Sequence, residues 1–304
     1  MVELNRILCP VDFSSFSERA LIYAMRMAQW YGATLDVVHV MPPLPPSASS
    51  ELAATTRELT AKNLRSLVER HRLPKVNVAT ELIESAEPAV QIRKFAESFN
   101  VDLVITGSHG RSGVQRVLLG SVVESLLHTS ARPVLIVPSH LDPQAIATMS
   151  FGRIVCAVDF AAASLDALAF ALSIAEEVDG ALTLLHVIEV PPELAHPPRS
   201  ADYDVTSVRA EAEAAALARL RELVPAHARE YCSIQTAILE GGAARQILRT
   251  AEEQDANLIV LGVHGRGAFD LAFFGSNSKD VIRHAQCPVL IVPAAKRESL
   301  RAAS

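Results

Sequence analysis

Residues 107–121 read GSHGRSGVQRVLLGS, and residues 262–276 read GVHGRGAFDLAFFGS. The two stretches are 155 positions apart, and residues 107–138 share 12 of 32 aligned positions with residues 262–293, including the closing string PVLIVP. A second matched pair, RILCPVDF at 6–13 and RIVCAVDF at 153–160, is 147 positions apart. The chain is therefore an internal duplication, and its second copy carries eight extra residues in its middle.

Short apolar runs alternate with longer amphipathic segments in both copies. In the first copy the apolar runs, which predict buried parallel strands, span residues 6–11, 34–40, 76–82, 101–106 and 133–137. The helical segments span residues 15–30, 50–72, 88–99 and 121–129, and the first of them opens with the capping-box string SFSE at 15–18. The second copy repeats this order, with a long Ala-, Glu- and Arg-rich helix expected over 206–230.

This alternation predicts an α/β fold of two tandem Rossmann-like domains, each an open five-stranded parallel sheet with helices on both faces. The expected boundaries are residues 1–140 for the first domain, 141–152 for a linker and 153–304 for the second domain. The linker region lacks clean periodicity and contains Asp142-Pro143.

Composition narrows the class of protein. The 304 residues are 50% hydrophobic, and 28 Lys and Arg against 34 Asp and Glu give a net charge of -6, which disfavours nucleic acid as a partner. No apolar run reaches the length of a membrane span, and we expect a cytoplasmic protein without a membrane partner. The four scattered cysteines predict buried free thiols.

Polar and glycine residues follow the predicted strands at the edge where ligands of open α/β sheets bind. Asp12 follows the first strand, Val40 ends the second, and the fourth leads into Gly107, Gly110 and Gly120 with Ser121 at a helix start. Glycines let backbone N–H groups approach an anion, and a helix N-terminus adds free donors, so this segment predicts a phosphate cradle. The second copy keeps the pattern, with residues Asp159, Val187, Gly262, Gly265, Gly275 and Ser276.

The spacing Gly, two residues, Gly, nine residues, Gly, Ser occurs twice and resembles the nucleotide-binding signature of the universal stress protein family. The resemblance covers nearly the whole chain and implies ATP, with or without Mg²⁺, as the ligand of each copy. It implies that Asp12, Asp159, Val40 and Val187 lie beside the adenine and ribose, and that the glycine loop and Ser121 or Ser276 hold the ribose and phosphates. One departure stands before the third helix, where the second copy has Gly241-Gly242 and the first has Ala86-Glu87-Pro88.

Each of these residues also has a purely structural interpretation. Asp12 and Asp159 could cap the following helix, and Val40 and Val187 could be core residues whose family contact runs through the backbone. Arg111 and Arg266 follow the second glycine of each loop, where phosphate contact and a solvated loop arginine are alternative roles.

Missing motifs separate the candidate functions. No lysine follows a glycine, which excludes a Walker-type NTPase, and no GxGxxG follows the first strand, which disfavours a dinucleotide-dependent dehydrogenase. No acid pair, base or metal cluster stands near the loop by spacing, which favours a nucleotide-binding regulatory module over the alternative, a slow ATP hydrolase or nucleotidyl-transfer enzyme. The resemblance implies that this module binds ATP and acts in a stress response. The resemblance also implies that strands 133–137 and 288–292 pair with each other in an internal pseudo-dimer; a homodimer of chains is a further possibility.

Overall fold

The computed structural model describes residues 2–110, 119–147, 151–189, 205–263 and 275–294. Each copy contributes five strands, within two residues of the predicted bounds in the first copy. The strands of the first copy are β1 (Arg6–Pro10), β2 (Thr34–Met41), β3 (Asn77–Glu84), β4 (Leu103–Gly107) and β5 (Val134–Val137). Those of the second are β6 (Arg153–Ala157), β7 (Ala181–Ile188), β8 (Ser233–Glu240), β9 (Leu258–Val263) and β10 (Val289–Pro293).

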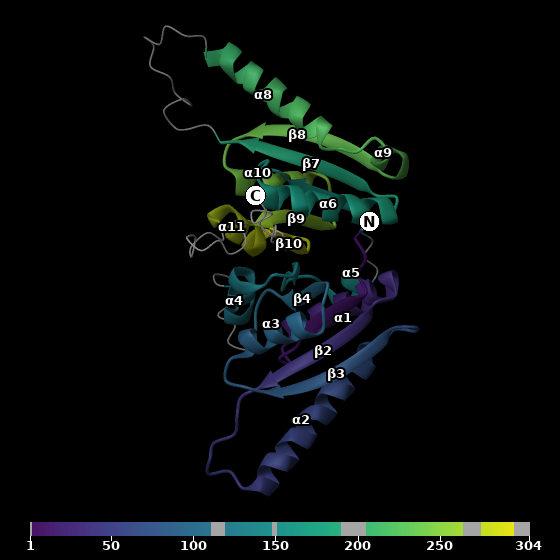
Figure 1. Ribbon diagram of the computed structural model, residues 1–304, viewed down its shortest axis with the longest axis vertical. Coiled ribbons are helices and arrows are strands. Elements are labelled where there is room, and N and C mark those ends of the chain that lie inside the picture. Colours follow the sequence, from purple (N-terminus) through teal and green to yellow (C-terminus); the bar gives the residue numbers. More distant parts are fainter. Residues whose placement is uncertain (1, 111–118, 148–150, 190–204, 264–274, 295–304) are drawn as a thin grey trace, which may run out of the picture.

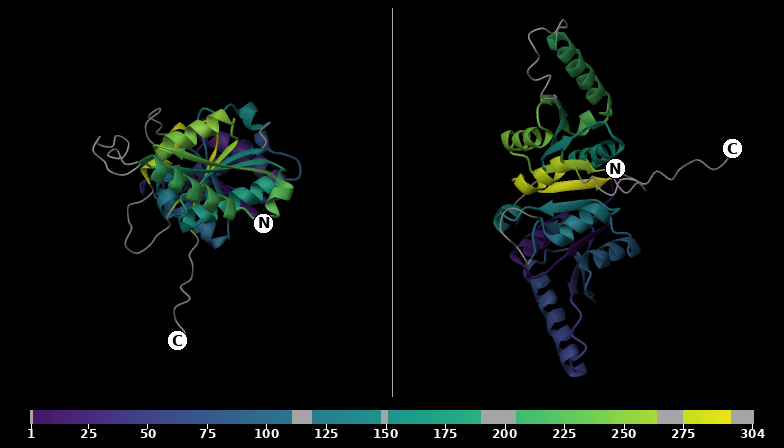
Figure 2. Two further views of the ribbon diagram at one scale, coloured as in Figure 1. Left: turned by 90° about the horizontal axis from the view of Figure 1, so that it is seen from above. Right: turned by 90° about the vertical axis from the view of Figure 1, so that its left-hand side faces the viewer.

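The ten strands form one continuous sheet in the order β3-β2-β1-β4-β5-β10-β9-β6-β7-β8. Neighbours within each copy are parallel, whereas β5 and β10 pair antiparallel, with Leu135 opposite Leu290. These two leucines are equivalent positions of the duplication, so a pseudo-two-fold axis passes between them. The copies consequently stack end to end into an elongated molecule (Figures 1 and 2). The predicted fold class and the predicted pairing of the last strands are both confirmed.

Helices cover both faces of the sheet. They are α1 (Ser15–Tyr31), α2 (Ser50–His71), α3 (Pro88–Ser98), α4 (Ser121–Thr129), α5 (Pro143–Ala147), α6 (Ala162–Glu177), α8 (Val205–Glu222), α9 (Ala228–Tyr231), α10 (Ala243–Glu253) and α11 (Ser276–His284). One apolar cluster packs α1, α2 and α6 on one face, and the other packs α3, α4, α10 and α11 on the opposite face. Alternate strand residues supply the two clusters, as Ile7 and Leu8 do in β1, because successive side chains of a strand point to opposite faces.

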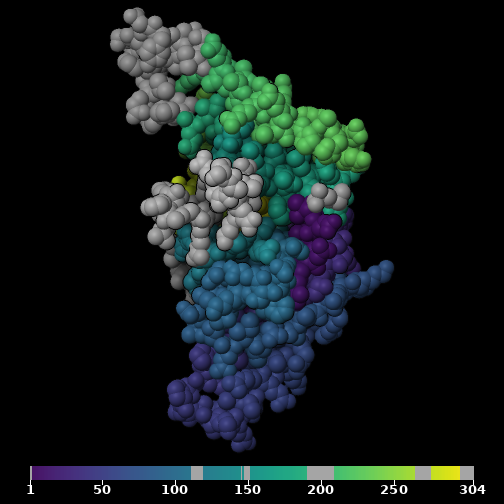
Figure 3. All heavy atoms as spheres, in the orientation of Figure 1, coloured from purple at the N-terminus to yellow at the C-terminus, as the bar shows by residue number. Residues whose placement is uncertain are grey.

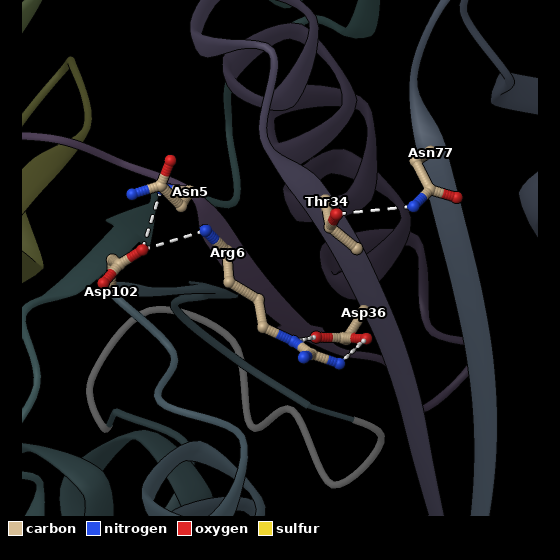
Figure 4. Close-up of polar contacts among 6 residues, drawn as sticks. All are labelled: Asn5, Arg6, Thr34, Asp36, Asn77 and Asp102. Atoms are coloured by element: carbon tan, nitrogen blue, oxygen red, sulfur yellow. Dashed lines mark hydrogen bonds and ion pairs between the residues drawn. The ribbon is translucent and has the colours of Figure 1, made fainter.

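A polar network fastens the amino ends of the first-copy strands (Figure 4). The Arg6 guanidinium donates to the carboxylate of Asp36 from β2 at 2.5 and 3.1 Å, and the Asp36 side chain is 3% exposed. The Asp102 carboxylate accepts the backbone N–H groups of Asn5 and Arg6. Buried charges are tolerated when they are paired and hydrogen-bonded, so this network ties β1, β2 and the start of β4 together at the edge opposite the predicted site.

Two local details differ from the sequence expectations. The N-cap of α1 is Ser14, whose Oγ accepts the Ser17 N–H, so the predicted capping box at Ser15 is wrong by one position. The helix expected over 206–230 is broken, because α8 ends at Glu222 and Pro225 separates it from α9. The short helix α5 lies within the expected linker.

The two copies also meet outside the strands. The Lys279 ammonium of α11 lies 3.3 Å from the Glu124 carboxylate of α4, and these positions are equivalent under the 155-residue offset. On the opposite face, burial and the neighbouring Glu177 carboxylate of α6 raise the pKa of Tyr31 in α1. The Val2 N–H donates to Ser173 Oγ at 2.6 Å, so the N-terminal segment lies against the second copy (Figure 3). The junction is therefore held by directed polar contacts as well as by strand pairing.

Candidate functional site

A cavity of about 270 Å³ opens at the carboxyl end of the first-copy sheet. Six residues singled out from the sequence line it together: Asp12, Val40, Gly107, Gly110, Gly120 and Ser121. The walls also include Pro10, Ser17, Pro88, Ile92, Thr106 and His109. Apolar walls with a few converging polar groups are typical of small-molecule sites, and we call this space the first cavity.

The Asp12 carboxylate is held by the turn that follows β1. Its Oδ1 accepts the Ser14 N–H at 3.0 Å and the Ser14 hydroxyl at 2.5 Å, while the Asp12 N–H donates to Ser17 Oγ. Asp12 therefore shapes the helix entrance, but the N-cap is Ser14. Its second oxygen, Oδ2, lies against the glycine loop, where a Cβ added at Gly110 would come within 2.9 Å of it. The carboxylate thus faces the predicted cradle from one side.

The glycines of the signature serve different physical purposes. A Cβ at Gly107 would lie 2.7 Å from the carbonyl oxygen of Phe16, so this glycine permits close packing of α1 on β4. The equivalent Gly262 is packed in the same way against the carbonyl of Ala163 in α6. Gly120 has a φ of −60° and therefore needs no left-handed backbone. Positive φ accordingly does not explain the choice of glycine at this position. An added Cβ would lie in ordinary contact, 3.4 Å from the Gly110 nitrogen, so the lack of a side chain keeps the space beside that nitrogen open.

Gly120 is the N-cap of α4, and no side chain among the described residues accepts from the N–H groups at the start of this helix. The Gly120 N–H donates to the Ser108 carbonyl at 3.1 Å, which closes the base of the glycine loop. The N–H groups of the first turn, beginning at Ser121, have no partner within the helix and carry the positive end of its dipole. An anion placed in the first cavity would meet these donors directly.

Two histidines that the sequence reasoning passed over hold the turn after the first strand of each copy. His39 Nδ1 donates to the Val11 carbonyl at 2.7 Å, and His186 Nδ1 donates to the Val158 carbonyl at the same distance. Each ring packs on a phenylalanine with a left-handed backbone, Phe13 with a φ of 63° and Phe160 with a φ of 64°. Their recurrence at the 147-residue offset was the signal that could have identified them.

The second copy forms an equivalent cavity of about 520 Å³, the second cavity. Asp159, Val187 and Gly262 line it, together with Asn277 and Ser278 of α11. The structure places Gly275 as the N-cap of α11 and Ser276 as its first residue, directly before these two lining residues. The Asp159 Oδ1 accepts the Ala161 N–H at 2.9 Å, which reproduces part of the Asp12 turn.

Three candidate residues, Arg111, Gly265 and Arg266, lie outside the described residues. The loop before the third helix differs between the copies: Gly241 has a φ of 125°, whereas the first copy has an extra residue there and an N-cap at Glu87. Within the described ranges, no group of three or more His, Cys, Asp or Glu side chains gathers as a metal site. None of the described helices combines the length and hydropathy that crossing a bilayer requires.

Comparison with known proteins gives a consistent assignment. The sequence model of the universal stress protein family matches residues 3–138 and again 150–293. A universal stress protein of Mycolicibacterium smegmatis is 29% identical over 297 residues, which covers 94% of this chain and 96% of that protein. One from Methanocaldococcus jannaschii is 32% identical over 149 residues, covering 49% of this chain and 85% of its own length. The crystal structure of a universal stress protein from Archaeoglobus fulgidus superposes with a TM-score of 0.70 at 24% identity, covering 96% of this chain and 99% of that one.

Proposed function

The chain belongs to the universal stress protein family, and we propose that it binds ATP in the first and second cavities and acts as a nucleotide-dependent regulatory protein in a stress response. The observation that carries the proposal is the convergence of Asp12, the glycine loop and the uncapped start of α4 on one cavity. A carboxylate suits the two hydroxyl donors of a ribose, and free N–H groups at a helix N-terminus suit phosphate.

The remaining walls of the first cavity suit an adenine ring. Val40, Ile92 and Pro88 supply apolar surface beside the ends of β1 and β2. The backbone N–H and C=O groups of Val40 lie at the end of a strand. Such groups can hydrogen-bond to a base and so discriminate one base from another. In the second cavity Val187, Ile247 and Ala243 take the corresponding places. Mg²⁺ would reach the site with the triphosphate, coordinated mainly by phosphate oxygens and water.

Titration calorimetry with ATP, AMP and GTP on the full chain tests this proposal. We expect two ATP per chain, and we expect Asp12→Asn to lower the affinity of one site about tenfold, since a charge-assisted hydrogen bond contributes roughly 1.5–3 kcal/mol. The amide of Asn can still accept the N–H of Ser14, so the turn itself is retained.

A matched control comes from the linker. Asp142 Oδ1 accepts the Gln144 N–H in the same kind of turn, outside both cavities, and Asp142→Asn should leave both affinities unchanged. Equal binding of GTP would contradict adenine recognition. Unchanged ATP binding by Asp12→Asn would show that the nucleotide does not use the first cavity.

A further inference from the structure

A third cavity, of about 310 Å³, lies at the junction of the two copies. The first copy contributes Ser108 and His109 after β4, Leu119, and the segment 138–140 after β5. The second copy contributes residues 282–284 at the end of α11 and Gln286. The cavity therefore exists only because β5 pairs with β10 and brings the end of α11 to the first copy (Figure 1).

The lining of this third cavity is rich in hydrogen-bond donors. Its polar side chains are those of Ser108, His109, Ser139, His140, Arg283, His284 and Gln286, and no Asp or Glu is among the described residues that line it. Hydroxyl, imidazole, guanidinium and amide groups all donate to oxyanions, and Arg carries a permanent charge. Among the described residues, the carboxylate that lies nearest to Arg283 is that of Asp280 at 3.9 Å, a loose contact, and 34% of the Arg283 side chain is exposed.

The end of α11 does not oppose an anion as strongly as a bare helix C-terminus would. The Asp280 carbonyl accepts from His284 Nδ1 at 2.8 Å, and the His284 carbonyl accepts from Gln286 Nε2 at 3.2 Å. Side-chain donors on the last carbonyls offset the negative end of the helix dipole. The charge that faces the cavity is then dominated by Arg283.

The duplication supplies an internal comparison for this lining. At the 155-residue offset, four of the seven polar positions carry alanine or valine in the other copy: Ser108 corresponds to Val263, Ser139 to Ala294, His140 to Ala295 and Gln286 to Ala131. Arg283 corresponds to His128 and His284 to Thr129, so the permanent charge is also absent from the counterpart. Of the two sets of positions that the duplication relates, the donors are thus concentrated in the set that lines the third cavity, as a binding site would require.

We propose that the third cavity binds a phosphate-type oxyanion, held by Arg283 and the surrounding donors. Two sources supply this chemistry: free inorganic phosphate or pyrophosphate, or the phosphate end of a nucleotide seated in the first cavity. His109 lines both the first and the third cavity, so the two spaces adjoin. The second source rests on the proposed function, whereas the first does not.

The test titrates the full chain with inorganic phosphate and with pyrophosphate as probes, and it measures binding by calorimetry at low ionic strength. We expect Arg283→Gln to weaken anion binding at least tenfold. Ser139→Ala and His140→Ala, which install the residues of the second copy, should each weaken it several-fold. His128→Gln, at the equivalent position of the other copy, is the matched control and should change nothing.

A second arm compares ATP with AMP in the Arg283→Gln variant. Weaker ATP binding with unchanged AMP binding identifies the phosphate end of a nucleotide as the occupant, whereas loss of phosphate binding alone identifies the free anion. If Arg283→Gln alters neither inorganic anion binding nor the ratio of ATP to AMP affinity, the third cavity is not an anion site. That result would leave the nucleotide proposal standing, because its own test depends on Asp12.

Discussion

Two glycines of one signature, Gly107 and Gly120, should respond differently to replacement by alanine. Alanine at Gly107 places a Cβ 2.7 Å from the Phe16 carbonyl oxygen and 2.9 Å from its carbon. Both are backbone atoms of α1, so the contact is relieved only by moving the helix away from β4. Overpacking of this kind costs about 1–3 kcal/mol, which for a chain of this size lowers the melting temperature by a few degrees or more.

Alanine at Gly120 meets a different environment. Its Cβ would lie 3.4 Å from the Gly110 nitrogen and 3.5 Å from His109 Cα, distances at which neighbouring atoms adjust. The φ of −60° suits alanine, so the free energy of unfolding should change by less than about 1 kcal/mol. The added methyl group would, however, contact the Gly110 nitrogen and cover its N–H. Blocking this donor to a phosphate should weaken ATP binding about tenfold or more.

Thermal unfolding followed by circular dichroism, together with calorimetric ATP titration of both variants, measures the two effects. Gly242→Ala is the control, because Gly242 is also the N-cap of a helix, has a φ of −72° and has no heavy atom within 4 Å of an added Cβ. A Gly107→Ala protein that melts like the wild type but loses ATP would refute the packing explanation. Loss of stability without loss of binding in Gly120→Ala would refute the cradle explanation.

Two further outcomes follow from the ion pairs and one from a buried thiol. Lys279→Glu places a second carboxylate against Glu124 and should lower stability by about 0.5–2 kcal/mol, with Glu124→Lys in the same chain restoring it in a thermal melt. Arg6→Ala leaves the Asp36 carboxylate buried without Arg6 and should lower the free energy of unfolding, measured with denaturant, by on the order of 2–3 kcal/mol. This loss is smaller than for a fully buried pair because the Arg6 side chain is 33% exposed. A similar loss on replacing an exposed arginine with alanine would contradict the prediction. Burial raises the pKa of Cys156 to about 12, above its unfolded value, so the stability that this thiol contributes is complete below pH 8.5 and declines as pH rises towards 12. Stability of a Cys156→Ala variant should therefore fall less over that alkaline range.

Local sequence signals predicted the elements well. The bounds of β2 and α4 agree closely with the apolar runs and caps from which they were predicted, because both elements bury their faces in ways that hydrophobic periodicity records. The capping box failed since two adjacent serines offer the same chemistry, and Asp12 selects Ser14 by bonding to it. The reason for glycine at 107 was also inaccessible, as it depends on a helix that packs from a distant part of the chain.

The third cavity could not be predicted from the sequence. His109 and Arg283 are separated by more than half of the chain, and only the register of β5 on β10 brings their segments to the same space. The pattern PVLIVP suggests an edge strand but gives no register, and no residue type around His140 stands out by spacing. Comparison between the two copies reveals the excess of donors once the structure shows which positions to compare.

Joining the copies in one chain changes how their pairing responds to concentration. Strands β5 and β10 would meet as two molecules if the copies were separate proteins, and their association would then follow the amount of protein present. The connecting segment is itself anchored, with the Leu141 carbonyl accepting from Arg19 and Ile146 buried, and short connections give effective concentrations of about millimolar. Dilution therefore does not separate β5 from β10. Each chain keeps one first cavity and one second cavity, and the junction between the two copies does not depend on the amount of protein expressed.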